Sequence, residues 1–250
     1  MLDFLEDQPT AYLDEMQDFL YYRYDVWPSI TTVYETLKRE NWSRKVVQQR
    51  AAERSALLRN AWKGLMPKWD ASELVFLDES AANERTGDRK RGWSLKGLTC
   101  PTSVPIKRSE RWSILPALTI DGYLDFEIFQ GSITSEIFID FVEKKVLPHC
   151  NPRPGPRSVL VLDNASIHRN RRLRELCEAY GVALEFLPPY SPDFNPIEAT
   201  FHDLKAWIRR NYRQADDFAD FRDFLEHAVI QTNGQNAKAH FRHAGYIVED

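Results

Sequence analysis

The chain has 250 residues, of which 43% are apolar and 28% charged, and its formal net charge is −4 at pH 7. This composition is ordinary for a globular protein and is sufficient for one large domain or two small ones. No apolar run approaches the roughly 18 residues that a membrane span needs, and the acidic amino terminus does not resemble a signal peptide. The three cysteines lack paired spacing, which indicates a reducing compartment and no zinc site. We therefore expect an intracellular protein, nuclear in a eukaryote and otherwise cytoplasmic.

The charge is distributed unevenly along the chain. Residues 1–37 contain eight acids and one arginine, a net charge of −7. Residues 38–111 contain 17 basic and nine acidic side chains (net +8), and residues 112–250 contain 15 basic and 20 acidic ones (net −5). The basic central segment has the charge to follow a phosphate backbone, although solvated helices would explain part of it equally well.

Two short helices joined by a turn are predicted near the amino terminus. Apolar residues recur at helical spacing over residues 10–24, where Thr10 is in position to cap the helix. Ser29 then caps a second helix, whose buried face would contain Ile30, Val33 and Leu37. The outward-facing side chains of the second helix would be Thr31, Thr32, Tyr34, Glu35 and Lys38.

Residues 41–69 are predicted to form a polar, basic and largely helical connector. Most of it has the composition of a solvated spacer. Arg44 and Lys45 directly follow the second helix and are the better candidates for phosphate contacts. We expect the cations of this connector, and those of a basic loop over residues 85–96, to be exposed.

From Asp70 onward the pattern changes to alternating strands and helices. The apolar run Leu74–Leu77 is typical of a strand buried on both faces. An Asp-Gly pair at 121–122 between the strand-like runs Trp112–Thr119 and Tyr123–Gln130 predicts a hairpin. The remaining predicted elements are a helix over Ser135–Leu147, a buried strand over Val159–Leu162, a helix over Arg171–Tyr180, a strand over Val182–Leu187 and a closing helix.

Three acidic residues lie at the ends of these elements. Asp78 and Asp163 follow the two buried strands, and Glu198 is the third residue of a helix that Asn195 would cap and Pro196 would begin. Each acid alone has an ordinary interpretation, as a strand end at the surface or as a helix-capping glutamate. Asp193 is a rival third member, but we favour Glu198 because a Ser-Pro-Asp turn commonly satisfies its own aspartate through the backbone.

A cluster of three carboxylates would require a cation, because like charges at close range cannot all remain ionised without one. Hard divalent ions such as Mg²⁺ or Mn²⁺ prefer oxygen ligands of this kind. Two such ions about 4 Å apart would clamp the attacking and leaving oxygens of a phosphoryl transfer. The pattern therefore indicates metal-dependent phosphodiester chemistry.

The residues around the three acids resemble those of the mariner superfamily of transposases, which are DDE enzymes with a ribonuclease-H-like fold. The matching stretches are Phe76–Ser80, Leu162–His168 and Tyr190–Glu198, and 34 residues separate Asp163 from Glu198, as the family spacing requires. The resemblance implies an α/β fold, a mixed five-stranded sheet flanked by helices, with the first and fourth strands adjacent. It also implies a helix-turn-helix-like DNA-binding segment over residues 1–40, truncated because relatives usually carry a second such unit upstream, a basic helical linker over 41–69 and a catalytic domain over 70–250.

The same resemblance implies a transposase-type endonuclease and strand transferase. Asp78 would bridge two Mg²⁺ or Mn²⁺ ions, Asp163 and Glu198 would hold one each, and Asn164 and His168 would support the site. The partners would be double-stranded DNA, both transposon ends and target, and a second copy of the chain, with no membrane and no small-molecule cofactor. The expected DNA-binding residues are Thr31, Thr32, Lys38, Arg44, Lys45, Arg89, Lys90, Arg91 and Lys96.

The alternative is a catalytically silent, transposon-derived protein that binds DNA or a partner without cutting. The incomplete amino-terminal segment favours this alternative, whereas three converging acids, which binding alone does not need, favour the enzyme. Ribonuclease H and Holliday-junction nucleases share the fold, but the run Ser191–Glu198 favours a transposase.

Overall fold

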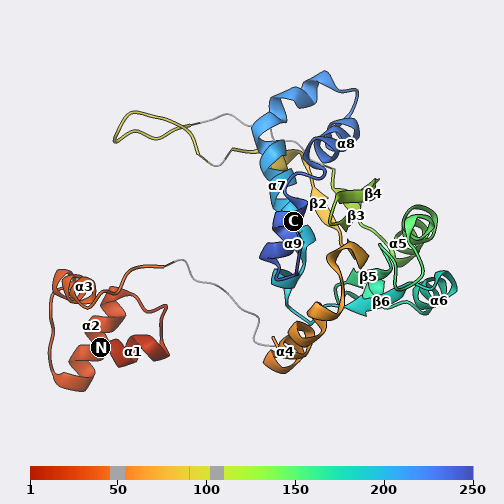
Figure 1. Cartoon of the computed structure of the whole chain (residues 1–250). Helices are drawn as coiled ribbons and strands as arrows, with labels where there is room; N and C mark the ends of the chain where they lie inside the picture. Colours follow the sequence, from red (N-terminus) through yellow and green to blue (C-terminus); the bar gives the residue numbers. More distant parts are fainter. Residues whose placement is uncertain (46–53, 90, 102–109, 250) are drawn as a thin grey trace. The chain divides into compact units, whose positions relative to one another are not determined.

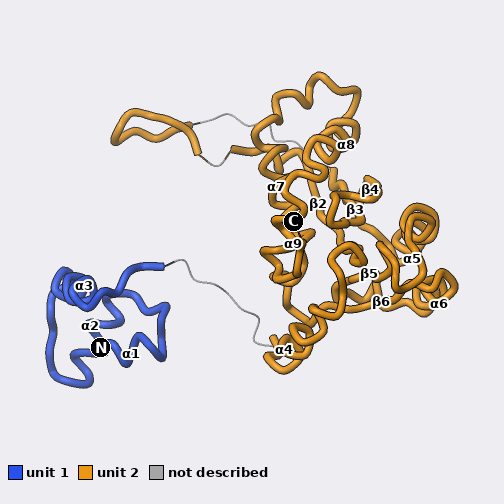
Figure 2. The backbone as a smooth tube through the Cα atoms, in the orientation of Figure 1, with its two compact units in different colours: residues 1–51 blue, residues 52–250 orange. Residues whose placement is uncertain are grey.

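The computed structural model describes residues 1–45, 54–89, 91–101 and 110–249. The chain forms two compact units, residues 1–51 and residues 52–250 (Figures 1 and 2). None of the described helices combines the length and the apolar composition that a membrane span requires.

The first unit is a small helical cluster. Leu5, Met16 and Val33, one from each helix, form its buried core. The helices are α1 (Leu2–Asp7), α2 (Leu13–Tyr24) and α3 (Ile30–Arg39). The sequence pattern predicts α2 and α3 but not α1, which is too short to show helical periodicity.

Two details of the predicted helices are wrong. Tyr12, rather than Thr10, occupies the cap position of α2. Ile30 is 46% exposed and does not belong to the buried face of α3. The predicted cap of α3 is confirmed, because the Ser29 hydroxyl accepts a hydrogen bond from the Thr32 N–H at 3.1 Å.

The second unit is built on a mixed sheet of six strands, one more than expected. The strands are β1 (Leu74–Leu77), β2 (Ser80–Ala82), β3 (Trp112–Thr119), β4 (Gly122–Gln130), β5 (Val159–Leu162) and β6 (Ala183–Phe186). Strand β5 is parallel to both β1 and β6, while β3 is antiparallel to β1, β2 and β4. The count differs because β2 is not among the expected strands: it follows β1 after Asp78 and Glu79, and both strands pair with β3.

Helices cover both faces of this sheet (Figure 1). They are α4 (Ala56–Leu65), α5 (Ser135–Phe141), α6 (Arg171–Tyr180), α7 (Pro196–Asn211), α8 (Phe221–Thr232) and α9 (Ala237–His243). The helix predicted to run to Leu147 leaves α-helical geometry after Phe141 and continues as a π-helical turn and then a 3₁₀ turn.

Strand β1 is buried on both of its faces and divides the interior into two cores. Leu74 and Phe76 pack toward α7 and α9, where Phe241 lies against Phe76. Val75 and Leu77 pack toward α5 and α6. All four side chains are fully buried, which explains why the strand is uniformly apolar rather than alternating. The acid that follows β1 is therefore attached to a fully buried strand.

Candidate active site

Two of the three candidate acids directly follow neighbouring strands of the sheet. In the parallel pair β1–β5, Leu77 lies opposite Leu162, and the next residue in each strand is an aspartate, Asp78 or Asp163. The carboxyl ends of adjacent parallel strands meet at one edge of the sheet, so the two side chains start from neighbouring points. The predicted adjacency of these two strands is confirmed.

The third acid, Glu198, lies in the first turn of α7, and the turn before this helix is held by α4. Asp193 accepts hydrogen bonds from Arg59 at 2.6 and 2.9 Å and from Arg54 at 2.6 Å. The Arg59 guanidinium also lies 4.1 Å from the centre of the Phe194 ring. Burial opposes ionisation of Asp193, but Arg59 and Arg54 outweigh it and lower the pKa of this carboxyl.

The main hydrogen-bond partners of Asp193 are therefore two arginines. The expectation that the backbone of its own turn would be its main partner is wrong. It also does not line the cavity described below. The expectation that the connector leaves its cations exposed is wrong for Arg54 and Arg59, whose side chains are only 20% and 14% exposed.

Asp78, Asp163 and Glu198 line a single cavity of about 470 Å³. Its other lining residues are Asn164, Arg169, Leu187, Pro188, Pro189, Tyr190, Ser191, Pro192 and Asn195. Burial, and then the negative charges of Asp163 and Glu198, raise the pKa of Asp78 to about 7. Burial also raises the pKa of Glu198, with Asp163 adding to the shift and Lys205 opposing it. The three carboxyl groups are thus close enough to act on one another electrostatically.

Asp163 is stabilised in its charged form by a buried histidine. His168 is fully buried; its Nδ1 lies 2.6 Å from Asp163 Oδ1 and its Nε2 lies 3.4 Å from Glu79 Oε2. Burial disfavours the charged imidazolium, but hydrogen bonds and charge from Asp163 and Glu79 raise the pKa of His168 to about 9. Burial likewise disfavours the Asp163 carboxylate, yet its hydrogen bonds to His168 and the Ala165 N–H lower its pKa.

Two asparagines make longer-range contacts. Asn195 occupies the cap position of α7, but its side chain does not cap the helix; its Nδ2 donates instead to Asp78 Oδ2 at 2.8 Å. The Asn164 side chain donates to the Leu187 carbonyl and accepts from Arg169. Sequence reasoning missed Glu79, Asn195 and Arg169 as site residues. The available signals were the position of Glu79 directly after Asp78 and the position of Asn195 three residues before Glu198.

The oxygen-rich donor set fits a hard divalent cation. Asp78, Asp163 and Glu198 supply carboxylate oxygens, and the charges of Asp163 and Glu198 help to raise the pKa of Asp78. Carboxylate oxygens are the ligands that Mg²⁺ and Mn²⁺ prefer. Across the described ranges, no three His, Cys, Asp or Glu side chains form a set that would hold one ion together.

The residues expected to bind DNA lie on both units. Thr31, Thr32, Lys38, Arg44 and Lys45 are exposed on the first unit. On the second unit Arg91 and Lys96 are exposed, Arg89 is exposed and donates to the Arg210 carbonyl at 3.1 Å, and Lys90 lies outside the described residues. None of the described members of this set lines the acidic cavity.

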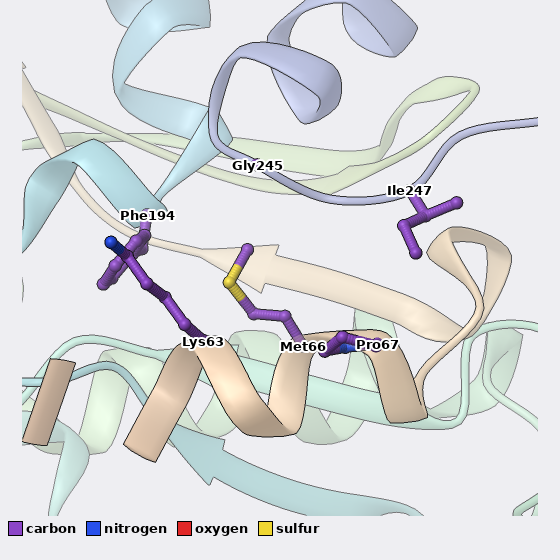
Figure 3. A pocket seen from close by; sticks show the side chains of 6 residues that line it. All are labelled: Lys63, Met66, Pro67, Phe194, Gly245 and Ile247. Atoms are coloured by element: carbon purple, nitrogen blue, oxygen red, sulfur yellow. The ribbon is translucent and has the colours of Figure 1, made fainter. Parts of the chain in front are cut away.

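A smaller hollow of about 230 Å³ lies beside the carboxyl end of α4 (Figure 3). It is lined by Lys63, Met66, Pro67, Phe194, Gly245 and Ile247. The Met66 side chain points into it between α4 and the carboxyl-terminal segment (Figure 3). These lining residues include one cation and no carboxylate, so they lack the groups for metal or acid–base chemistry.

Comparison with known proteins points to one family. The DDE superfamily endonuclease family matches residues 73–222, more than half of the chain. The uncharacterized protein y4pE/y4sA of Sinorhizobium fredii (strain NBRC 101917 / NGR234) is 32% identical over 79 residues, which are 32% of this chain. Those residues cover 53% of that protein, so the match spans about half the length of this curated relative.

Solved structures of the Mos1 transposase share the fold. The Mos1 transposase paired-end complex with left transposon end gives a TM-score of 0.63 at 16% identity, over 99% of this chain and 78% of that chain. The Mos1 mariner paired-end complex with Mg gives a TM-score of 0.61 at 16% identity, with the same coverage. The predicted ribonuclease-H-like fold is confirmed.

Proposed function

The chain belongs to the DDE superfamily of endonucleases, and from this premise we propose that it is a transposase-type enzyme that hydrolyses and rejoins DNA phosphodiesters. The observation that carries the proposal is that Asp78, Asp163 and Glu198 line one cavity, at the ends of two adjacent strands and the start of a helix. Packing and helix capping do not require three mutually repelling acids in one place.

Asp78, Asp163 and Glu198 would be the catalytic residues and the ligands of two Mg²⁺ or Mn²⁺ ions, with Asp78 shared between them. When bound, such ions supply nucleophile activation and stabilisation of the leaving oxygen. Each ion would contact two of the three acids, so the site does not need all three around one ion. Mg²⁺ usually keeps several waters beside one or two carboxylates, which suits this sharing.

The surrounding residues hold the carboxylates in place. The described hydrogen bonds to Asp163 end on Oδ1, from His168 and from the Ala165 N–H, which leaves Oδ2 available as a ligand. Asp78 is held by the Glu79 N–H on Oδ1 and by Asn195 on Oδ2, both at 2.8 Å. Because His168 is buried between two carboxylates, it fixes the loop after β5 rather than exchanging protons with solvent.

The substrate would be double-stranded DNA, both transposon ends and target, bound by a homodimer. Residues 1–40 would form a helix-turn-helix-like recognition segment, in which Thr31, Thr32 and Lys38 face the DNA. Arg44 and Lys45 in the linker, together with Arg89, Lys90, Arg91 and Lys96, would contact phosphates without reading sequence. The Mos1 complexes with a transposon end support DNA as the partner.

The test is nicking of supercoiled plasmid in Mg²⁺ or Mn²⁺ by the wild type and by Asp163→Asn. Asparagine keeps the shape and the Oδ1 acceptor but removes the charge that a cation needs. We expect nicking to fall by about a hundredfold or more, because losing the ions removes several kcal/mol of barrier lowering. DNA binding should hardly change, since it depends on arginines and lysines elsewhere.

Asp217→Asn, at an exposed carboxylate of the same unit, is the matched control and should nick like the wild type. If Asp163→Asn cuts as well as the wild type, Asp163 is not a metal ligand. If the wild type never nicks, with any plausible DNA end, the protein is the silent binding protein instead.

A further inference from the structure

The lining of the acidic cavity combines two kinds of chemistry. It includes the three carboxylates and the segment Leu187–Pro192, which contains three prolines, a leucine and one aromatic residue. Arg169 is the one basic side chain among the described lining residues. Metal binding alone needs the acids but neither the apolar residues nor the cation. A nucleotide, which combines an anionic phosphate with the apolar face of a base, would use both.

Arg169 is held in a fixed position at this cavity. Asn164 donates to the Leu187 carbonyl and accepts from an Arg169 guanidinium nitrogen. The Leu187 N–H in turn donates to the Leu162 carbonyl at 2.8 Å, which extends the β5–β6 pairing up to the residue before Asp163. The arginine is thus tied to the sheet edge that carries Asp163. Its contact with Asn164 uses one of five N–H donors, and the exposed side chain has others with which to bind a phosphate.

Tyr190 is an aromatic residue that lines the same cavity. Its backbone φ is +54°, in the left-handed region that a bulky residue rarely adopts, and 58% of the residue is exposed. The loop around it is fixed by prolines and by the buried Ser191, whose hydroxyl donates to the Pro189 carbonyl at 3.1 Å. A strained backbone that turns a ring outward rather than into the core indicates a binding role for that ring.

We propose that Arg169 and Tyr190 form a subsite for one nucleotide of the DNA strand beside the carboxylates, with the phosphate on Arg169 and the base stacked on Tyr190. The inference rests on the proposed function and specifies the ligand of the cavity as one nucleotide. The cavity volume of about 470 Å³ lies in the range of small-molecule sites. A base that stacks on Tyr190 must leave its own stack, so the ligand is a single-stranded or flipped nucleotide.

The experiment measures binding of a labelled single-stranded oligonucleotide of about 20 nucleotides in Ca²⁺, by fluorescence anisotropy over a range of salt concentrations. Arg169→Gln should weaken binding about five- to thirtyfold and lower the slope of log affinity against log salt by about 0.7, the value for one phosphate on a single strand. Arg169→Lys should keep the slope and lose part of the affinity. Tyr190→Ala should weaken binding about five- to hundredfold, whereas Tyr190→Phe, which keeps the stacking face, should bind like the wild type.

Two controls match the changes in charge and in aromatic area. Arg171→Gln removes an exposed arginine two residues away that pairs with Glu175, and Tyr180→Ala removes a ring that is 40% exposed at the end of α6. Neither residue lines the cavity. Equal losses in Arg169→Gln and Arg171→Gln, or in Tyr190→Phe and Tyr190→Ala, would overturn the subsite. Circular dichroism of each variant shows whether it is folded, and Arg169→Lys and Tyr190→Phe decide the question if a larger change disturbs the fold.

Plasmid nicking by the same proteins separates this inference from the proposed function. If the wild type nicks and the Arg169 and Tyr190 variants bind and nick equally well, the subsite is wrong and the enzyme assignment stands. If the wild type does not nick but these two variants selectively weaken oligonucleotide binding, the subsite stands and the enzyme assignment is wrong.

Discussion

Asp78→Asn should make the metal-free protein more stable at neutral and alkaline pH while abolishing its response to Mg²⁺. Burial and the charges of Asp163 and Glu198 raise the pKa of Asp78 to about 7, so its ionised form is disfavoured in the folded state. The folded protein therefore keeps a proton on Asp78 between about pH 4 and pH 7, where the unfolded chain has already lost it. Stability falls as the pH rises through this window, and the full penalty is present above pH 7.

The size of the effect follows from the two pKa values. A carboxyl whose pKa changes from 3.8 to about 7 on folding lowers the free energy of unfolding by about 4 kcal/mol at pH 8. The substitution has a small structural cost, because the Oδ1 position keeps the Glu79 N–H as its donor. The buried Asn195 Oδ1 lacks a described partner and would accept from the new amide if the Asn195 side chain rotates by half a turn. We expect a net gain of about 1–3 kcal/mol, or several degrees in Tm for a unit of this size.

The assay is thermal and urea denaturation in EDTA at pH 8 and pH 5, with Asp217→Asn as the control at an exposed carboxylate. The gain from Asp78→Asn should shrink to under half at pH 5, because wild-type Asp78 is then protonated in the folded state. Mg²⁺ at pH 8 should raise the Tm of the wild type, and not that of the variant, because the ion binds only the folded state. A variant that is less stable than the wild type at pH 8, or a difference independent of pH, would refute the reasoning.

Two further predictions concern the scaffold. Asp193→Asn should lower the free energy of unfolding of the second unit by about 1–2 kcal/mol at pH 7, after solvent screening, because Arg59 and Arg54 lose their carboxylate partner. Since Arg59 and Arg54 lower the pKa of Asp193, this loss should fade as the pH falls below about 4; urea denaturation checks both, and an equal loss at pH 3 would contradict the ion pair. Phe76→Ala should cost about 3–5 kcal/mol, because it empties a fully buried site against Phe241, and Phe76→Leu should cost clearly less. Similar midpoints for these last two variants in urea would show that the core does not depend on the ring.

The sequence predicts the elements whose signals are local. The hairpin strand Trp112–Thr119 and the helix Arg171–Tyr180 have the predicted bounds, because turn chemistry and helical periodicity act within a few residues. The burial of Leu74–Leu77 on both faces of the sheet can also be predicted from the local sequence, because an unbroken apolar run has no polar residues to face solvent. The short strand β2 carries no such local signal, because it depends on pairing with β3.

The parts of the site that escaped prediction depend on partners far away in the sequence. Asn195 has the sequence of a helix cap, but a carboxylate 117 residues upstream attracts its amide instead. Asp193 has the sequence of a self-satisfied turn, but arginines 134 and 139 residues upstream hold it. In both cases the local hydrogen bond, in the helix cap or in the turn, is worth about 1 kcal/mol. The charge-assisted hydrogen bond to the distant partner is stronger and outweighs it.

The distribution of cations around the acids sets Asp78 apart from Asp163, Glu79 and Asp193. His168 lies between Asp163 and Glu79, and two arginines hold Asp193. Asp78 differs: its described contacts are a backbone N–H and the neutral amide of Asn195, while its nearest charges are all negative. A fold that places cations beside three of its acids and only neutral donors beside a fourth stores electrostatic free energy at that fourth acid. Because its surroundings raise the pKa of Asp78 to about 7, a divalent ion would replace its proton near neutral pH, and under the proposed function this would make Asp78 the acid best suited to be shared between two ions.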